Sequence, residues 1–265
     1  MNPLRIGTFN LLHGIAMGPA PTDPDLLRTA AVELGADVLG IQEVDRHQER
    51  SGSVDQTAEI ADAVGAAHWR FVPVVHGTPG EERGWHEGVH DDGENTDGPT
   101  YGIGMVSRLP VLSWRVKRFP AAPFAIPLVV PGPNRPRIVR IPDEPRAALA
   151  AVVDGPRGPF TVMTAHLSFV PGYNVRQLRA IARWAERFPG PVLLAGDFNL
   201  PGSLPRRITG WRALADGATY PSMNPKVQFD HVLAHGLRQD AVVSSQVHRL
   251  AVSDHCGLSV DLDLD

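Results

Sequence analysis

The sequence predicts an α+β fold in which helices cover the outer faces of two packed, mixed β-sheets. Short apolar runs of strand length alternate along the chain with amphipathic segments of helical period. Two of these runs are joined by the Gly/Pro-rich turn 154–159, which indicates a hairpin, whereas others are separated by a helix. Because hairpins and strand–helix alternation occur in one chain, a mixed sheet is favoured over a doubly wound parallel sheet.

The first half of the chain predicts two helices between its strands. One helix should begin at Thr22-Asp23-Pro24, where a cap precedes a first-turn proline, and end at Gly35. A second should begin where Ser53 and Gln56 have the spacing of a capping box, and run through Val64. The strands expected in this half are Leu4–Asn10, Asp37–Glu43, Trp69–Val75 and Tyr101–Ser107.

The second half predicts one long amphipathic helix and five strands. Asn174 and Gln177 have the spacing of a helix start, apolar residues follow on one face, and Pro189 ends the pattern. The strands expected here are Ala147–Val153, Phe160–His166, Val192–Gly196, Phe229–Ala234 and Leu258–Leu262.

Two segments lack any periodicity and are predicted to be long loops. Residues 76–100 are rich in glycine and acids, and residues 119–146 are rich in proline and arginine. Strands of one core are expected on both sides of each segment, so residues 1–265 are interpreted as one domain. Long loops inside compact domains are often functional, and a surface insertion is the alternative.

Composition excludes several classes of protein. A chain of 265 residues that is 43% hydrophobic can bury a core, which excludes global disorder. The single Cys256 excludes a disulfide framework and a cysteine-based zinc site. No apolar run approaches the roughly 20 residues of a membrane span, and the N-terminus lacks a signal-peptide core, so a cytoplasmic protein is expected. The net charge of −4 disfavours non-specific nucleic-acid binding, and the oligomeric state is not indicated.

Residues suited to catalysis or metal binding repeatedly end or follow the apolar strands. They are two carboxamides, four carboxylates and two histidines: Asn10, Glu43, His166, Asp197, Asn199, Asp230, Asp254 and His255. Each has an ordinary structural explanation when taken alone, such as a turn or a helix cap. Their joint occurrence at strand ends instead predicts one site at an edge of the sheets, where rigid strands hold several side chains together.

These residues lie in the motifs TFN, QEV, TAHLS, GDFN, FDHVL and SDH. In this order between Thr8 and His255, the motifs resemble the signature of the endonuclease/exonuclease/phosphatase (DNase I-like) superfamily. The resemblance covers nearly the whole chain and implies a single catalytic domain with a four-layer α/β/β/α sandwich. It also implies a divalent-metal-dependent phosphoric ester hydrolase.

The resemblance further implies roles for individual residues. Asn10, Glu43 and Asp254 would bind the metal, and hard oxygen ligands suit Mg²⁺ or Mn²⁺. Asp197 would orient or deprotonate the attacking water, and Asn199 would donate to the phosphate. A second ion held by Asp197 and Asn199 is the alternative, so one or two ions are expected.

The two histidines are expected to have distinct surroundings. Asp230 would pair with His255, fix its tautomer and favour its charged form. His166 would contact the phosphate or assist the leaving group, and which histidine is acid or base stays open. His231 follows Asp230 within a strand and should face the opposite side, as a structural residue.

Arg146 and Tyr101 are weaker candidates for contact with the substrate. Arg146 opens a predicted strand and could clamp a phosphate, with a solvated arginine as the alternative. Tyr101 also opens a predicted strand and could line the pocket, with a packing role as the alternative.

The expected substrate is a small or lipid-like phosphomonoester or phosphodiester, and a DNA or RNA endo- or exonuclease is the alternative. Segment 76–100 carries one arginine and seven acids, which are Glu81, Glu82, Glu87, Asp91, Asp92, Glu94 and Asp97. If the segment flanks the site, these acids would repel a polyanion. Leu12 also stands where abasic-site endonucleases of the family carry an acid.

A local positive patch could still support a nuclease, and its candidate residues are Arg135, Arg137, Arg140, Arg206 and Arg207. A catalytically silent binding module is a third hypothesis. The complete set of eight site residues argues against that hypothesis, because a silent module would not need all of them.

Overall fold

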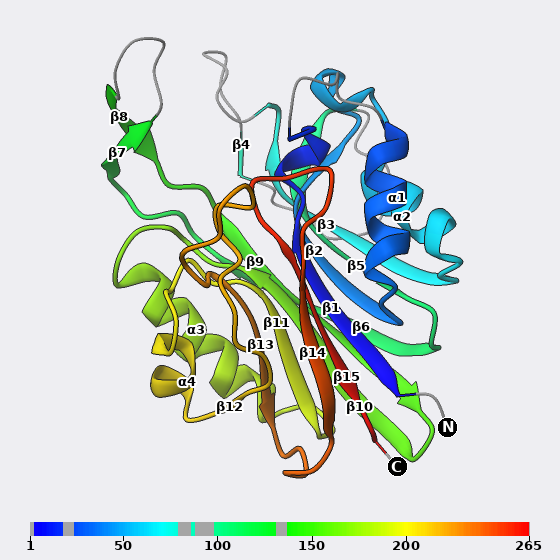
Figure 1. The fold of residues 1–265 in the computed structure, drawn as a ribbon. Coiled ribbons are helices and arrows are strands. Elements are labelled where there is room, and N and C mark those ends of the chain that lie inside the picture. The colour runs from blue at the N-terminus through cyan, green and yellow to red at the C-terminus, as the bar shows by residue number, and fades with distance from the viewer. Residues whose placement is uncertain (1–2, 18–23, 79–85, 88–97, 131–136, 265) are drawn as a thin grey trace.

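Two mixed β-sheets form the centre of the molecule (Figure 1). The computed structural model describes residues 3–17, 24–78, 86–87, 98–130 and 137–264. The strands of the first sheet are β1 (Leu4–Asn10), β2 (Val38–Arg46), β3 (His68–His76), β4 (His86–Glu87), β5 (Thr100–Ser107), β14 (Val242–His248) and β15 (Gly257–Leu262). Those of the second are β6 (Val111–Phe119), β9 (Arg146–Gly155), β10 (Gly158–His166), β11 (Val192–Asp197), β12 (Arg212–Ala213) and β13 (Asp230–His235).

The strand orders are β14-β15-β1-β2-β5-β3-β4 and β12-β13-β11-β10-β9-β6. Strands β1 and β2 pair in parallel, as do β10 and β11, whereas the remaining pairs described in the two sheets are antiparallel. Both sheets are therefore mixed, as the sequence predicts.

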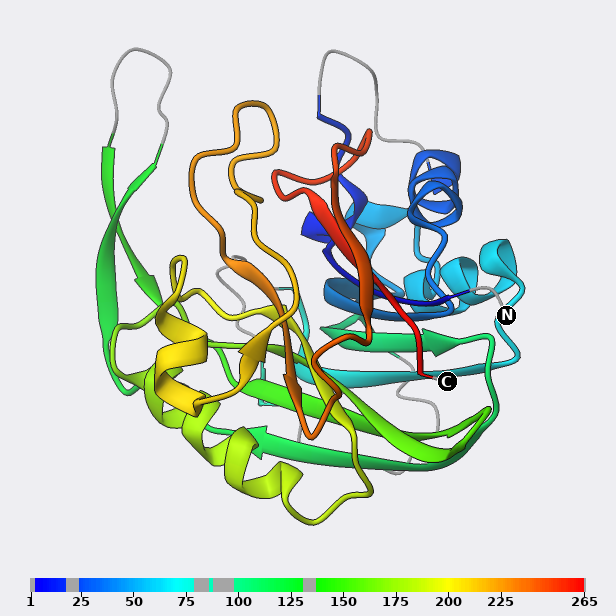
Figure 2. The same cartoon turned by 60° about the horizontal axis from the view of Figure 1, so that its bottom comes forward.

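Helices cover the outer face of each sheet, which gives four layers (Figures 1 and 2). Helices α1 (Pro24–Leu34) and α2 (Gln56–Val64) cover the first sheet, and α3 (Tyr173–Ala185) and α4 (Leu204–Thr209) cover the second. Along β10, Val162 belongs to the core between the sheets, whereas Met163 belongs to the core beneath α3. Because both faces of the central strands are buried, their sequences are almost continuously apolar. The predicted α/β/β/α sandwich is confirmed.

The two sheets approach closely below the edge where the candidate residues gather. A Cβ atom on Gly40 of β2 would lie only 2.4 Å from Oγ1 of Thr164 on β10. Next to this contact, Gln42 Nε2 donates to Thr164 Oγ1 at 2.9 Å, and Thr8 Oγ1 donates to Gln42 Oε1 at 3.2 Å. Buried side-chain hydrogen bonds thus join the sheets and fix their relative position beneath the site.

The structure corrects the prediction of a long loop at 119–146. Residues 125–130 and 137–142 form strands β7 (Ala125–Val130) and β8 (Arg137–Pro142), which pair as an antiparallel hairpin separate from both sheets (Figure 1). Of segment 76–100, residues 86–87 pair with β3, and residues 79–85 and 88–97 lie outside the described part. A role for that segment stays a prediction.

Two predicted helices are present, but the residues that cap them differ from the prediction. Asp55, not Ser53, caps α2, and its carboxylate accepts from the backbone N–H groups of Thr57 and Ala58. Gly172 is the N-cap of α3, so Asn174 and Gln177 do not form a capping box there. The predicted cap at Thr22-Asp23 lies outside the described residues.

Strands β6 and β14 were not predicted from the sequence. Both lie at a sheet edge, where half-exposed strands carry polar residues that weaken the apolar signal. None of the described helices has the length and the apolar stretch that crossing a bilayer requires.

Candidate active site

The eight candidate residues converge at one edge of the sandwich. Asn10, His166 and Asp197 are the last residues of β1, β10 and β11, and Asp230 is the first residue of the antiparallel β13. Parallel strands end at the same edge of a sheet, and an antiparallel neighbour begins there. Glu43 lies in β2, Asn199 follows β11, and Asp254 and His255 precede β15. The predicted set is thus brought together from both sheets.

Asp197 is the centre of this cluster. Its Oδ1 accepts from the backbone N–H of Asn199 at 2.9 Å, and its Oδ2 accepts from Nδ2 of Asn10 at 3.0 Å. Nε2 of His166 lies 3.6 Å from Oδ2, and Nε2 of His255 lies 3.8 Å from the same atom. Burial raises the pKa of Asp197 to about 6, although the His255 charge opposes the increase. Asp197 can therefore accept a proton near neutral pH.

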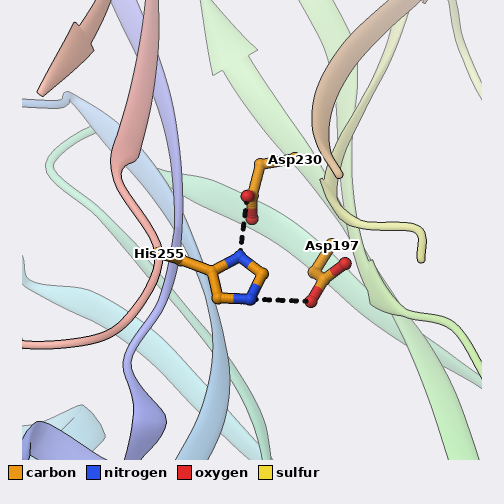
Figure 3. Close-up of side chains that lie close together, drawn as sticks. All are labelled: Asp197, Asp230 and His255. Carbon is orange, nitrogen blue, oxygen red and sulfur yellow. Dashed lines mark hydrogen bonds and ion pairs between the residues drawn. The ribbon is translucent and has the colours of Figure 1, made fainter. Parts of the chain in front are cut away.

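The carboxylate of Asp230 lies against the ring of His255 (Figure 3). Nδ1 of His255 donates to Oδ2 of Asp230 at 2.8 Å, while Nε2 points toward Asp197. Burial alone would lower the pKa of His255, but the carboxylates of Asp230 and Asp197 outweigh it and raise the pKa to about 10. The imidazolium is thus a permanent donor around pH 7, as the predicted Asp–His pair requires.

Asn10 bridges two carboxylates through its amide nitrogen. Oδ1 accepts from the backbone N–H of Leu12 at 3.1 Å, so Nδ2 must face the site. Nδ2 donates to Glu43 Oε1 at 2.9 Å as well as to Asp197 Oδ2. A metal ligand would instead present its oxygen, so in this arrangement Asn10 positions the carboxylates.

Glu43 occupies a strained backbone position beside Asn10. Its φ is 55°, and the pairing of β2 with β5 skips from Ile41 to Val44, which marks a bulge. Asn199 also has a left-handed φ, 49°. Such conformations in non-glycine residues persist where surrounding structure aims a side chain into a site. Burial, opposed by the Asn10 hydrogen bond, raises the pKa of Glu43 to about 7.

Arg146 lies behind His166 instead of at the opening of the site. The arginine side chain is 4% exposed, and its Nη1 is 3.0 Å from Nδ1 of His166. Because a guanidinium only donates, Nδ1 accepts and the ring proton lies on Nε2, which faces Asp197. Burial, together with the charge of Arg146, holds the pKa of His166 well below its usual value. His166 is therefore neutral while His255 is charged.

Tyr101 lies on the Glu43 side of the cluster. It is 5% exposed, and the guanidinium of Arg50 lies 5.7 Å from its ring centroid. Burial, and then the charge of Glu43, raises its pKa well above the usual value. Arg50 in turn donates twice to the buried carboxylate of Asp45, at 2.7 and 2.8 Å. Tyr101 thus belongs to a rigid wall beside Glu43.

The cluster has a donor set that fits a divalent cation. Ligand atoms of Asp197, Asp230 and His255 all lie within 4.8 Å of one another, a spacing that would suit a metal ion if His255 gave up its proton. Within the described part of the chain, Oδ1 of Asp230 is buried without a hydrogen-bond partner, and the half-buried carboxylates of Glu43 and Asp254 add negative charge. A set dominated by carboxylate oxygens suits Mg²⁺ or Mn²⁺ better than Zn²⁺.

Three residues that hold the site loops in place were not predicted from the sequence. Nδ2 of Asn174 donates to the carbonyl of Asn199 at 3.0 Å, and Oε1 of Gln177 accepts from the N–H of Ser168 at 2.8 Å. Ser253 Oγ donates to the carbonyl of Asn10 at 2.6 Å and accepts from the N–H of His255 at 3.0 Å. The only sequence signal was the spacing of Asn174 and Gln177, which matches a capping box equally well.

His231 is structural, as predicted. It is buried, its Nε2 lies 2.9 Å from the carbonyl oxygen of Leu200, and its ring stacks on Phe198 at 5.4 Å.

Comparison with known proteins agrees with the fold and the residue order. The model of the Endonuclease/Exonuclease/phosphatase family matches residues 7–255. Comparison with curated proteins gives no match. Among solved structures, an endonuclease/exonuclease/phosphatase from Beutenbergia cavernae is similar, with a TM-score of 0.61 at 21% identity over 100% of this chain and 72% of its own.

Two further solved structures have the same fold. A mannosyl-6-phosphatase from Bacteroides thetaiotaomicron has a TM-score of 0.58 at 14% identity, over 98% of this chain and 100% of its own. Sphingomyelinase C from Streptomyces griseocarneus has a TM-score of 0.57 at 15% identity, over 99% of this chain and 100% of its own. At such identities, the likeness shows the fold alone.

Proposed function

The chain belongs to the endonuclease/exonuclease/phosphatase family, and from this premise we propose that it is a Mg²⁺- or Mn²⁺-dependent phosphoesterase. The observation that supports the proposal most strongly is the position of the Asp197 carboxylate. It accepts hydrogen bonds from the Asn10 side chain and the Asn199 backbone. It also lies between the neutral His166 and the charged His255. Hydrolysis of a phosphoester needs a group that takes a proton from water and donors for the developing negative charge.

Glu43 and Asp254 would hold the ion, and Asn10 would keep Glu43 in place. We prefer these ligands to the Asp197–Asp230–His255 group because a protonated His255 has no lone pair to offer. Asp197 and Asn199 remain the alternative for a second ion. The bound ion would neutralise negative charge on the phosphate.

The protein's own residues would carry out the remaining steps. Asp197 would accept the proton of the attacking water at Oδ2. His255 would donate its Nε2 hydrogen to a phosphate oxygen, and Asp230 would keep that donor charged. His166 would donate from Nε2 to the phosphate or to the leaving oxygen, and Asn199 Nδ2, which lies 3.3 Å from that atom, would donate beside it.

A small or lipid-like phosphomonoester or phosphodiester is the proposed substrate. Since the similar structures show only the fold, this preference depends on charge: the chain has a net charge of −4, and segment 76–100 is acidic. A nuclease is the second candidate, because Arg137 and Arg140 are exposed on the β7–β8 hairpin and could contact a polyanion.

One experiment separates these possibilities. Protein stripped with EDTA is assayed with added Mg²⁺ or Mn²⁺ against 4-nitrophenyl phosphate, bis(4-nitrophenyl) phosphate, sphingomyelin vesicles and supercoiled plasmid, with Asp197→Ala as the control. We expect metal-dependent turnover of at least one of the first three substrates, abolished in Asp197→Ala. Plasmid nicking without turnover of the others would establish the nuclease instead, and full activity in EDTA would contradict metal dependence.

A further inference from the structure

A groove of about 350 Å³ runs along α3 beside the end of β6, and none of the eight site residues is among the residues that line it. Its cationic lining consists of Arg176, Arg179 and Arg183. These three positions are three to seven residues apart on the helix, so they span about 10 Å of its length. Among the described residues, none that lines the groove is acidic.

The three arginines are exposed, and within the described part of the chain none forms an ion pair with an acid. Like charges three and four residues apart on one helix destabilise it. Although the whole chain has a net charge of −4, positive charge is concentrated along this face of α3. This charge makes the groove complementary to an anion.

Apart from Gln177, the rest of the described lining is largely apolar and contains aromatic rings. Phe119 and Pro120 form one wall at the end of β6, and Ala180 forms part of the helix wall. At the N-terminal end of α3, the guanidinium of Arg176 lies 5.6 Å from the ring centroid of Tyr173. These groups offer flat surfaces on which a ring can stack, beside the charges of the arginines.

Gln177 supplies an independent sign of a missing partner. It lines the groove and is only 4% exposed, and its Nε2 is buried with no hydrogen-bond acceptor among the described residues. The side chain cannot turn to satisfy this nitrogen, because Oε1 accepts from the N–H of Ser168. A buried donor left unpaired is unfavourable unless another group completes it.

We propose that this groove binds an organic anion that combines a ring with phosphate, sulfonate or carboxylate groups, at a site separate from the catalytic cluster. The anionic groups would contact Arg176, Arg179 and Arg183, and the ring would pack on Phe119 and Ala180. The volume of the groove is at the lower end of the range found for small-molecule sites.

The test uses naphthalene-1,5-disulfonate as the probe, because a phosphoesterase cannot hydrolyse its carbon–sulfur bonds. Isothermal titration calorimetry at 50 mM NaCl should show saturable binding of one probe per chain. Sodium sulfate at equal ionic strength should bind at least tenfold more weakly, since it has no ring. Equal binding of sulfate would contradict the proposed class of ligand, and the absence of saturable probe binding would overturn the site.

Variants locate the binding. Arg176→Gln combined with Arg183→Gln should weaken probe binding at least tenfold, and Ala180→Phe should abolish it by filling the groove without changing the charge. Arg207→Gln, an exposed arginine on α4, is the matched control and should change the affinity less than twofold. Probe binding that is equal in all four proteins would show that it occurs elsewhere.

Kinetics with whichever phosphoester the protein hydrolyses in the assay described above decide whether the groove is a separate site. The double arginine variant should keep kcat and KM within twofold of the parent values. A rise in KM for the substrate that parallels the loss of probe binding would make the groove part of the substrate path and would overturn the proposal. Circular dichroism confirms that every variant is folded.

Discussion

Nδ1 of His255 lies 2.8 Å from Oδ2 of Asp230, and the two side chains are 9% and 0% exposed. This contact keeps His255 charged in a buried place, where imidazole would otherwise be neutral. We therefore expect Asp230→Asn to lower kcat/KM at pH 8 about 10²- to 10³-fold. Relative to the parent at the same pH, part of the activity should return toward pH 5.5, where the histidine is protonated again. The exposed Asp240→Asn is the control, and an unchanged pH profile would contradict this role.

The same pair determines how stability depends on pH. The pKa of His255 is raised from 6.5 to about 10, so its contribution is complete below pH about 6.5 and is lost as the pH rises toward 10. Urea denaturation of the parent should therefore show a free energy of unfolding that falls between pH 7 and 9.5. The decrease should be smaller in Asp230→Asn. If the free energy of unfolding fell equally steeply with pH in both proteins, His255 would not carry the assigned positive charge.

Glu43 should destabilise the protein when no metal is bound. Its pKa is raised from 4.5 to about 7, so the stability that it contributes in its protonated form is lost as the pH rises through 7. Glu43→Gln keeps the acceptor for Asn10 and should increase the free energy of unfolding at pH 8 in EDTA by about 1–2 kcal/mol, a figure reduced for partial solvent access.

The same variant should lose most of the increase in Tm that Mn²⁺ gives the parent. Differential scanning fluorimetry measures the Tm in EDTA and the increase in Tm on adding Mn²⁺. The exposed Glu49→Gln is the control. A normal response of Glu43→Gln to Mn²⁺ would exclude Glu43 as a ligand.

Asn10 can be tested as a donor against its predicted role as a metal ligand. Asn10→Asp replaces the bridging N–H group with a third carboxylate beside Glu43 and Asp197. In EDTA at pH 8, this change should lower the free energy of unfolding by about 2–4 kcal/mol. The exposed Asn224→Asp should have little effect. A neutral result for Asn10→Asp would indicate that the amide oxygen, not the nitrogen, faces the site.

Arg146 should affect kcat more than KM. Its guanidinium contacts Nδ1 of His166 and lies 3.7 Å from Glu144, so it positions the histidine without reaching the opening of the site. We expect Arg146→Lys to lower kcat about 10- to 100-fold while KM changes less than threefold. Steady-state kinetics with Arg115→Lys as the exposed control distinguish this role from the predicted phosphate clamp. A clamp would instead raise KM.

Gly40 tests the close approach of the two sheets. A methyl group there would lie 2.4 Å from Oγ1 and 2.6 Å from Cβ of Thr164. Gly40→Ala should therefore lower the free energy of unfolding by about 2–3 kcal/mol in urea denaturation. Gly98→Ala, where the added methyl group meets open space, should be close to neutral. Equal stability of the two variants would mean that the sheets can separate locally at no cost.

Local patterns predicted most of the central strands and the residues at their ends. Strands such as β1 and β11 are largely buried on both faces and rich in apolar residues, so even a single sequence shows them clearly. The edge strands β6 and β14 and the β7–β8 hairpin were missed because half-exposed strands mix polar and apolar residues. The capping-box pattern was misleading, because Asn174 and Gln177 bond to loops that only the folded chain brings near them.

The sequence by itself determined the layered fold and the identity of the polar residues at the strand ends, since both depend on the local order of side chains. The tertiary structure alone decided what each of these residues contacts. Asn10 and Asp197 are 187 positions apart, and the amide of Asn10 turns its nitrogen inward because of Leu12 on one side and two carboxylates on the other. Arg146 is likewise placed behind His166 by the pairing of β9 with β10. Hydrogen-bond direction, burial and charge depend on neighbours distant in the chain, and no local pattern encodes them.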